Sequence, residues 1–307
     1  MYDLIIVGGG PAGLTAAIYA IRKRLNVLLL TRDLGGKTNY HLALPWIEDY
    51  HVIRGLEIVN KFRRELEYLS FAHRFDRAER IDKKDDHFIV STKEGMTLES
   101  KAVIIATGAR QARMNVPGEK EFTMKGLCYS ALSYAPLFID KTVIVIGDDD
   151  LALRSAAELA TVAKHVYLVC AGDHVLDSPL WMKLQTAMNV TILNGHQVVE
   201  VKGDQFARSL VTRDPAGKIV EHDADGIFVE KALVPQTEMV KDRVAMDEHG
   251  RIMVDYANRT DVPGLFAAGD VTSGYAEQVL IAVGEGAKAA LSAYEYLLPT
   301  LAITVTV

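Results

Sequence analysis

Cysteine is scarce in this chain. Only Cys128 and Cys170 occur among its 307 residues, and they lie far apart. Two such residues form neither a disulfide framework nor a zinc site of closely spaced ligands, so we expect no metal. We also expect no signal peptide, because the first residues read directly as an apolar strand. These absences predict a protein of the reducing cytoplasm.

Long apolar runs and an excess of basic residues are missing too. No apolar stretch reaches the length of a membrane span. Lys and Arg number 34 against 40 Asp and Glu, which gives a formal net charge of −6. Nucleic-acid binding needs a dense basic face, so we expect neither a membrane nor a nucleic acid as a partner. A hydrophobic share of 49% is typical of a globular protein, and the length allows two domains.

A glycine-rich turn near the N-terminus is the first informative feature that is present. An apolar run ends in Gly8-x-Gly10-x-x-Gly13, an alanine-rich stretch follows over 14–21, and a second apolar run covers 26–30. This order predicts the strand, tight turn, helix and strand of a dinucleotide-binding βαβ unit. Gly8 permits the turn, Gly10 lets the backbone approach a pyrophosphate, and Gly13 allows close helix–strand packing. The helix N-terminus would then direct N–H groups at the phosphates. The competing interpretation is an ordinary structural turn.

A second glycine-punctuated strand and helix follow later in the chain. The run 141–147 predicts a strand that ends at Gly147, with a helix over 151–162 and a strand over 165–169. We therefore expect an α/β protein of two Rossmann-like, three-layer domains. The other predicted segments are a buried strand over 101–108, a linker over 110–125, antiparallel meanders over 74–98 and 191–227, a strand over 262–270 and a last helix over 278–297.

Several motifs occur together in an order that points to one family. They are Gly8-Gly9-Gly10-Pro11-Ala12-Gly13, Ala106-Thr107-Gly108-Ala109, Val116-Pro117-Gly118-Glu119, and Phe266-Ala267-Ala268-Gly269-Asp270-Val271 with Glu277-Gln278-Val279. Over nearly the whole chain they resemble the low-molecular-weight thioredoxin reductase branch of the pyridine nucleotide–disulfide oxidoreductases. The resemblance implies a homodimer. It also implies an FAD-binding domain, here 1–114 and 245–307, split around a degenerate NAD(P)H-binding-like domain at 115–244.

The resemblance further implies which residues hold FAD. The glycines of the first turn would cradle the pyrophosphate, and Asp270 would bond a ribityl hydroxyl. The helix that opens after Gln278 would stabilise negative charge on the reduced flavin. The expected cofactor-binding residues are Gly8, Gly10, Pro11, Ala12, Gly13, Thr31, Arg32, Gly35, Gly36, Lys37, Asp49, Ala106, Thr107, Gly108, Gly269, Asp270, Gln278 and Val279.

Some of these positions depart from the family pattern. Lys37 stands where the family usually has Gln, and Asp49, near the flavin pyrimidine edge, stands where it usually has Asn. Thr31 replaces the acidic residue that would hold the adenosine ribose. Its hydroxyl can still hydrogen-bond a ribose, and Arg32 could lie against adenine or phosphate.

The larger departures fall on the redox chemistry. The family's Cys-x-x-Cys-Asp pentad aligns with Ser130, Ser133 and Tyr134. A serine hydroxyl cannot cycle between dithiol and disulfide, and a phenol with a reference pKa near 10 does not replace a carboxyl proton donor. Cys128 is the weak remaining candidate for a redox residue, and the better interpretation of Cys128 is an inert buried thiol. Engineered Cys-to-Ser replacements are a further explanation of the serines.

The second nucleotide motif is also altered. Asp148, Asp149 and Asp150 stand in the turn where the family has Gly-x-Gly-x-x-Ala. Neither the arginine cluster for a 2′-phosphate nor the usual glycine near Pro-x-Thr is present. Carboxylates at contact range repel a phosphate by roughly 4 kcal/mol per charge pair at an effective dielectric of 20. The structural interpretation of this acidic run is a helix N-cap, whereas consecutive residues do not converge into a cation site.

These observations predict an FAD-containing oxidoreductase that transfers electrons through its flavin without NADPH. The donor would be a ferredoxin, a second flavin or a small molecule. Three alternatives stay open: a disulfide reductase in which Ser130 and Ser133 replace cysteines, a non-catalytic FAD-binding protein, and a ferredoxin–NADP reductase-like enzyme.

Overall fold

The structure is a computed structural model that describes residues 1–48, 55–172 and 178–301. The chain divides into two compact units. The first comprises 1–39, 53–110 and 234–307, and the second comprises 40–52 and 111–233.

These boundaries differ from the expected 114 and 245, and the cores show why. Val240 is fully buried in the core of the first unit, so the segment 234–244 belongs there. Trp46 packs edge-on against Phe138 of the second unit, with the ring centroids 5.6 Å apart. The loop around Trp46 therefore belongs to the second unit, although the sequence places it between two elements of the first.

The first unit is built, within the described residues, on a seven-stranded sheet with the order β3-β2-β1-β6-β5-β4 and with β17 paired to β6. The first three strands, β6 and β17 run parallel, and β4, β5 and β6 form an antiparallel meander. The strands are β1 (Tyr2–Val7), β2 (Val27–Thr31), β3 (His73–Phe75), β4 (Ala78–Lys84), β5 (His87–Thr92), β6 (Thr97–Ile105) and β17 (Leu265–Ala267).

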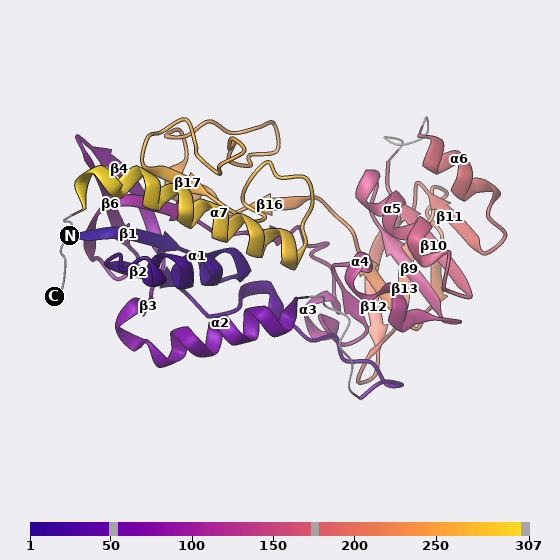
Figure 1. Ribbon diagram of the computed structural model, residues 1–307. Helices are drawn as coiled ribbons and strands as arrows, with labels where there is room; N and C mark the ends of the chain where they lie inside the picture. Colours follow the sequence, from indigo (N-terminus) through magenta and orange to yellow (C-terminus); the bar gives the residue numbers. More distant parts are fainter. Residues whose placement is uncertain (49–54, 173–177, 302–307) are drawn as a thin grey trace. The chain divides into compact units, whose positions relative to one another are not determined.

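The helices of the first unit cover one face of this sheet. Figure 1 shows α7 lying along α1, with α2 beside them. Strand β1 is buried on both faces: Leu4 and Ile6 enter the core beneath α1 and α7, and Ile5 and Val7 enter the core on the opposite face. The helices are α1 (Pro11–Arg22), α2 (Leu56–Tyr68) and α7 (Val279–Leu297), with short 3₁₀ turns η1 (Gly36–Asn39), η2 (Ser70–Ala72), η4 (Glu238–Val240) and η5 (Leu298–Thr300).

The second unit has a parallel sheet of its own. In the part of the chain that is described, its order is β11-β10-β9-β15-β8, and a separate antiparallel sheet has the order β12-β13-β14. The parallel strands are β8 (Leu127–Cys128), β9 (Thr142–Ile146), β10 (His165–Cys170), β11 (Val190–Asn194) and β15 (Gly226–Val229), and the antiparallel ones are β12 (Gln197–Gly203), β13 (Ala207–Arg213) and β14 (Ile219–Asp223). The helices are α3 (Glu119–Phe122), α4 (Ala131–Tyr134), η3 (Ala135–Phe138), α5 (Asp150–Leu159) and α6 (Pro179–Thr186). A further pair, β7 (Ala109–Gln111) and β16 (Leu233–Pro235), forms a two-stranded sheet.

The predicted fold class is confirmed, and one predicted meander is wrong at its ends. The antiparallel stretch within 74–98 is present as β4, β5 and the start of β6. In 191–227, however, only β12 to β14 are antiparallel, whereas β11 and β15 join the parallel sheet. Strand β15 is buried along its whole length. Because the polarity alternates in the strands that precede β15 along the chain, the sequence did not distinguish this short inner strand of the parallel sheet from the meander.

Two histidines of the second unit share one buried hydroxyl group. Thr212 Oγ1 lies 3.0 Å from His196 Nδ1 and 3.0 Å from His222 Nε2. The hydroxyl can donate to one ring and accept from the other, which requires at least one neutral imidazole. Burial, and next the nearby His196, lowers the pKa of His222.

We expect this arrangement to make the second unit less stable in mild acid. Because the folded pKa of His222 lies below its unfolded value, its contribution to stability is present above about pH 6.5 and is lost as the pH falls through that value towards the folded pKa. When the pH is lowered from about 7.5 to 5.5, the unfolding temperature of the variant His222→Gln should therefore fall by less than that of the parent protein. Thermal unfolding of both proteins at the two pH values measures this. Equal losses would contradict the expectation.

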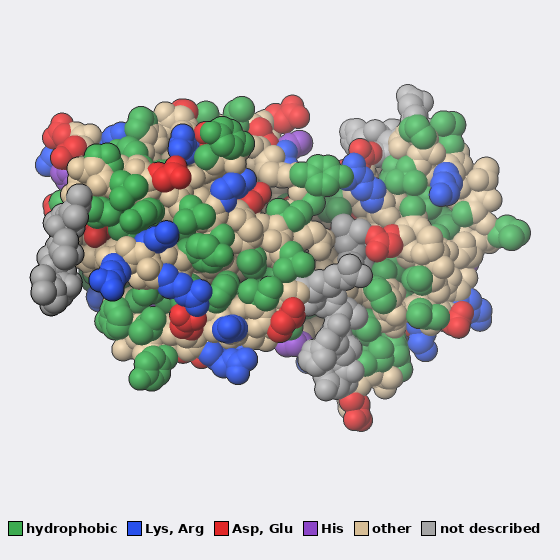
Figure 2. Space-filling view, in the orientation of Figure 1, with side chains coloured by type: hydrophobic (Ala, Val, Ile, Leu, Met, Phe, Trp, Pro, Cys, Tyr) green, Lys and Arg blue, Asp and Glu red, His purple; other side chains and the backbone are tan. Residues whose placement is uncertain are grey.

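The molecular surface agrees with the balanced composition. Figure 2 shows Lys, Arg, Asp and Glu side chains interspersed over the face that is drawn. Among the described residues, none of the helices is long and apolar enough to cross a membrane.

Candidate cofactor site

The glycines of the first turn are required by close backbone contacts. Gly8 has φ +109°, a conformation that L side chains rarely adopt, and a Cβ on it would collide with Ala106 O. A Cβ on Gly13 would collide with Gly8 O. The turn at the end of β1 therefore lies tightly against both the start of α1 and the end of β6.

Gly10 is different, because space is open around it. A Cβ built on Gly10 meets nothing within 4 Å. Gly10 is the N-cap of α1 and has no side chain to cap the first turn. The first hydrogen bond of the helix runs from Leu14 N to Gly10 O at 2.9 Å, so the N–H groups of Ala12 and Gly13 lie outside the helical ladder. Pro11, the first residue of α1, has no N–H group that would need a partner. This open helix N-terminus fits a pyrophosphate.

The loop after β2 closes over the same turn. Gly35 N donates to Gly9 O at 2.7 Å, and a Cβ on Gly36 would lie 3.0 Å from Gly10 Cα. Thr31 Oγ1 donates to Asp33 O at 2.7 Å. The hydroxyl proton of Thr31 is thus used within the loop, and only its acceptor capacity remains for a ribose.

Lys37, in η1, contacts the other predicted flavin segment. Its Nζ lies 2.7 Å from Asp270 Oδ2 and 3.6 Å from Glu277 Oε2. Arg32 is exposed, and Asp49 lies outside the described residues.

The turn after β6 is held by a glutamine that the sequence did not single out for this site. Thr107 Oγ1 donates to Gln236 O at 2.6 Å, and Gln236 Nε2 donates back to Thr107 O at 2.6 Å. Ala106 N donates to Val7 O, and Gly108 has φ +67° with open space where a Cβ would lie. In the sequence, Gln236 is marked only by its position directly after Pro235. The strand that pairs with this segment lies far away in the sequence, so the contact with Thr107 could not be predicted.

A glutamate that the sequence also missed supports the last motif. Gly269 N donates to Glu285 Oε2 at 2.7 Å. Burial raises the pKa of Glu285, and the bond from Gly269 opposes that rise. Gln278 is the N-cap of α7, and its side chain does not cap the first turn. The first helical bond joins Ala282 N to Gln278 O at 3.0 Å, so the N–H of Val279 precedes the ladder.

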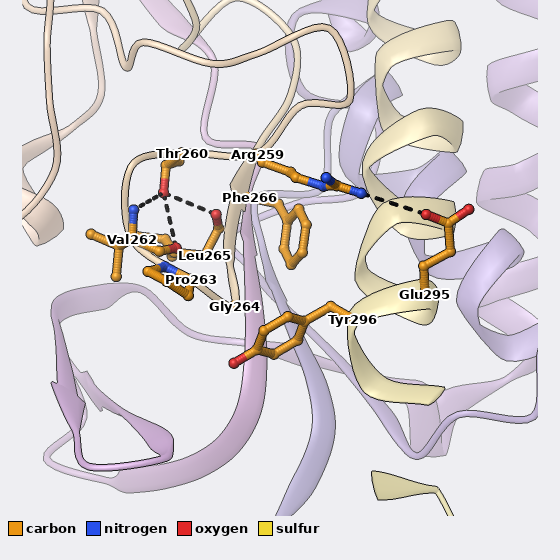
Figure 3. Close-up of a pocket in the computed structure, with 9 residues that line it drawn as sticks. All are labelled: Arg259, Thr260, Val262, Pro263, Gly264, Leu265, Phe266, Glu295 and Tyr296. Atoms are coloured by element: carbon orange, nitrogen blue, oxygen red, sulfur yellow. Dashed lines mark hydrogen bonds and ion pairs between the residues drawn. The ribbon is translucent and has the colours of Figure 1, made fainter. Parts of the chain in front are cut away.

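A separate pocket of about 360 Å³ lies at the opposite end of β17 from Asp270. Figure 3 shows Arg259 paired with Glu295, at 3.5 Å, and the rings of Phe266 and Tyr296 on its wall. Thr260 accepts from Val262 N at 3.1 Å and donates to Leu265 O at 2.9 Å, which closes the loop on itself. None of the predicted cofactor residues lines this pocket.

Comparison with known proteins places this geometry in a family. The family model described as pyridine nucleotide-disulphide oxidoreductase matches residues 2–286. The chain belongs to this family. Members of the thioredoxin reductase kind bind FAD, so the predicted cofactor of this oxidoreductase is confirmed.

Three relatives illustrate the range of the family. One component of the alkyl hydroperoxide reductase of Xanthomonas campestris pv. phaseoli is 38% identical over 98% of this chain and 58% of its own length. The chain thus spans under three fifths of that curated relative. The crystal structure of thioredoxin reductase from Streptococcus pyogenes is 33% identical, with a TM-score of 0.87 over 97% of this chain and 99% of that chain. A ferredoxin-flavin thioredoxin reductase from Clostridium acetobutylicum is 28% identical, with a TM-score of 0.50 over 97% of this chain and 98% of that chain.

The second glycine turn of this oxidoreductase differs from the first at its helix N-terminus. Asp149 is the N-cap of α5, and its Oδ1 accepts from Ala152 N at 3.1 Å. The carboxylate thus occupies the N–H group and the positive end of the helix dipole that a phosphate would use. Burial, and next the nearby Asp148, raises the pKa of Cys170 to about 12.

The positions of the family's redox pair are close together. Ser130 Oγ donates to Ser133 Oγ at 3.0 Å. Tyr134 is buried, and its hydroxyl lies 3.5 Å from Tyr40 O. Cys128, the weak candidate, is fully buried in β8, and burial, with Glu230 as the next cause, raises the pKa of its thiol well above the usual value. The thiolate that redox chemistry needs is therefore disfavoured at Cys128.

Proposed function

We propose that this oxidoreductase transfers electrons through FAD without using NADPH as the donor and without a disulfide of its own. FAD supplies reversible two-electron chemistry when it is bound. The chain's residues bind its pyrophosphate at α1 and hold the ribityl side through Asp270. The observation that carries the proposal is the contrast between the two helix N-termini, open at Gly10 and capped by Asp149 in α5.

A ferredoxin is the donor that we favour. The support comes from the similarity to a solved ferredoxin-flavin thioredoxin reductase. A second flavin or a small molecule is the next candidate. We further propose a homodimer, because the thioredoxin reductase resemblance implies one, and a cytoplasmic location, because the two scattered cysteines fit a reducing compartment.

Anaerobic reduction of the purified yellow protein tests the donor. We expect NADPH and NADH to leave the flavin absorption band unchanged, whereas reduced ferredoxin bleaches it. Dithionite serves as the control that the flavin is reducible. Stoichiometric bleaching by NADPH would contradict the proposal and favour the ferredoxin–NADP reductase-like alternative. A flavin that dithionite and light both fail to reduce would favour a non-catalytic FAD-binding protein.

A disulfide reductase is the second candidate function, and the facing hydroxyls of Ser130 and Ser133 are its specific support. In that case the redox pair would be native cysteines replaced in this sequence, or the thiols would come from another protein. The alkyl hydroperoxide reductase component from Xanthomonas campestris has further residues that this chain does not match, since the chain covers 58% of its length. Thiols supplied by another protein would be compatible with that difference.

A further inference from the structure

Lys37 lies where three segments of the FAD site meet. It follows Gly35 and Gly36, whose loop closes over the first turn at Gly10. Its ammonium group contacts Asp270, which follows β17, and Glu277, which directly precedes the N-cap of α7. All three segments are those that the family resemblance assigns to the ribityl chain and the flavin.

The pairing is strong for a partly exposed site. Lys37 Nζ lies 2.7 Å from Asp270 Oδ2, and the Asp270 side chain is only 18% exposed. Burial, the largest single effect, acts to lower the pKa of Lys37, but the two carboxylates together raise it. Lys37 is therefore charged at neutral pH, and it neutralises one of the two carboxylates that it contacts. A third carboxylate, Glu285, lies next to the same turn through its bond from Gly269 N.

We propose that Lys37 is a positioning residue for FAD that joins the loop after β2 to Asp270 and Glu277 and raises the reduction potential of the bound flavin. This inference rests on the FAD site of the proposed function and does not depend on the identity of the donor. The glutamine that the family usually has at this position could hydrogen-bond Asp270 but could not balance its charge.

The charges around Lys37 affect how readily a flavin bound at this site is reduced. Reduction by two electrons leaves more negative charge on the flavin, so nearby carboxylates oppose reduction and a nearby cation favours it. With Lys37 removed, Asp270 loses the ammonium group that it contacts, and Glu277 keeps only the more weakly acting Arg251 as a cation. Burial, the largest cause, raises the pKa of Glu277, and Lys37, together with the weaker effect of Arg251, limits that rise.

The test is a potential measurement on the FAD-loaded protein with reference dyes. We expect Lys37→Gln to lower the equilibrium constant for two-electron reduction at least tenfold, a shift of about 30 mV to more negative potential. Lys37→Arg should keep most of the parental potential. Glu277→Gln, which removes a negative charge, should shift the potential in the opposite direction, and the double variant should return towards the parent.

Lys101→Gln is the matched control. It removes the same charge from a pair of similar length, Lys101 Nζ to Asp3 Oδ1 at 2.8 Å, near the N-terminal end of β1 in the same unit. Its potential should equal that of the parent. Unchanged potentials in both Lys37→Gln and Glu277→Gln would overturn the inference, and they would do so even in a protein that binds FAD fully. If Lys37→Gln failed to bind FAD, the single variant Glu277→Gln would still show in which direction the charges at this site shift the flavin potential. Failure of the parent itself to bind FAD would instead overturn the proposed function.

Discussion

We expect Gly10→Asp to yield a colourless protein that is at least as stable as the parent protein without its cofactor. Gly10 has φ −72° and ψ −175°, an extended conformation that aspartate adopts freely, and its Cβ meets no atom within 4 Å. Aspartate is a preferred N-cap residue and glycine is only slightly worse, so the new carboxylate should stabilise α1 by roughly a few tenths of a kcal/mol. The same carboxylate would face the pyrophosphate. A repulsion of about 4 kcal/mol at an effective dielectric of 20 corresponds to roughly a thousandfold loss of FAD affinity.

The opposite signs of the two effects make this a sharp test. FAD affinity is measured by fluorescence titration of the apoprotein, and stability by its thermal unfolding. Gly10→Asn is the matched control, because it has the same size and capping ability without the charge. It should bind FAD more tightly than Gly10→Asp. A yellow Gly10→Asp protein with parental affinity would show that the pyrophosphate does not lie at α1.

Cysteines placed at both serine positions should form a disulfide. The double variant Ser130→Cys/Ser133→Cys replaces two oxygens that lie 3.0 Å apart with sulfur atoms on longer bonds, so the sulfurs reach bonding distance with little backbone movement. Thiol titration of the denatured, oxidised variant should give the two native thiols, and reduction should raise the count to four. Each single variant should give three thiols before reduction as well as after it.

The same variant separates the two candidate functions. We expect NADPH-linked reduction of thioredoxin to remain at background, because Asp149 still caps α5. Recovery of turnover with NADPH would show that the second turn accepts the nucleotide after all. The chain would then be a disulfide reductase whose cysteines had been replaced.

The sequence predicted the two βαβ units well, because each is a local pattern. The spacing of Gly8, Gly10 and Gly13 after an apolar run defines a strand, a turn and a helix within one short stretch. The N-cap interpretation of the acidic run at 148–150 is confirmed by the bond from Ala152 N to Asp149. That cap too is a local feature, with the partners three residues apart.

What the sequence missed depends on contacts between distant segments. Glu285 reaches Gly269 from the second turn of α7, and Gln236 reaches Thr107 from a position directly after β16, more than a hundred residues later. Neither residue type is unusual at its place, so no composition or spacing marks it. The pairing of Lys37 with Asp270 is of the same kind. The sequence showed only that a lysine replaces the family's usual glutamine at position 37. The fold shows that this lysine contacts the carboxylate of Asp270.

Burial of both native thiols makes the chain convenient for site-specific labelling. Cys128 and Cys170 are fully shielded, and burial raises the pKa of each, that of Cys170 to about 12. Alkylating probes react with thiolates, so the unmodified folded protein should incorporate a maleimide dye very slowly at neutral pH. One cysteine introduced on each unit would then carry one dye of a pair, and energy transfer between the dyes would measure the distance between the two units.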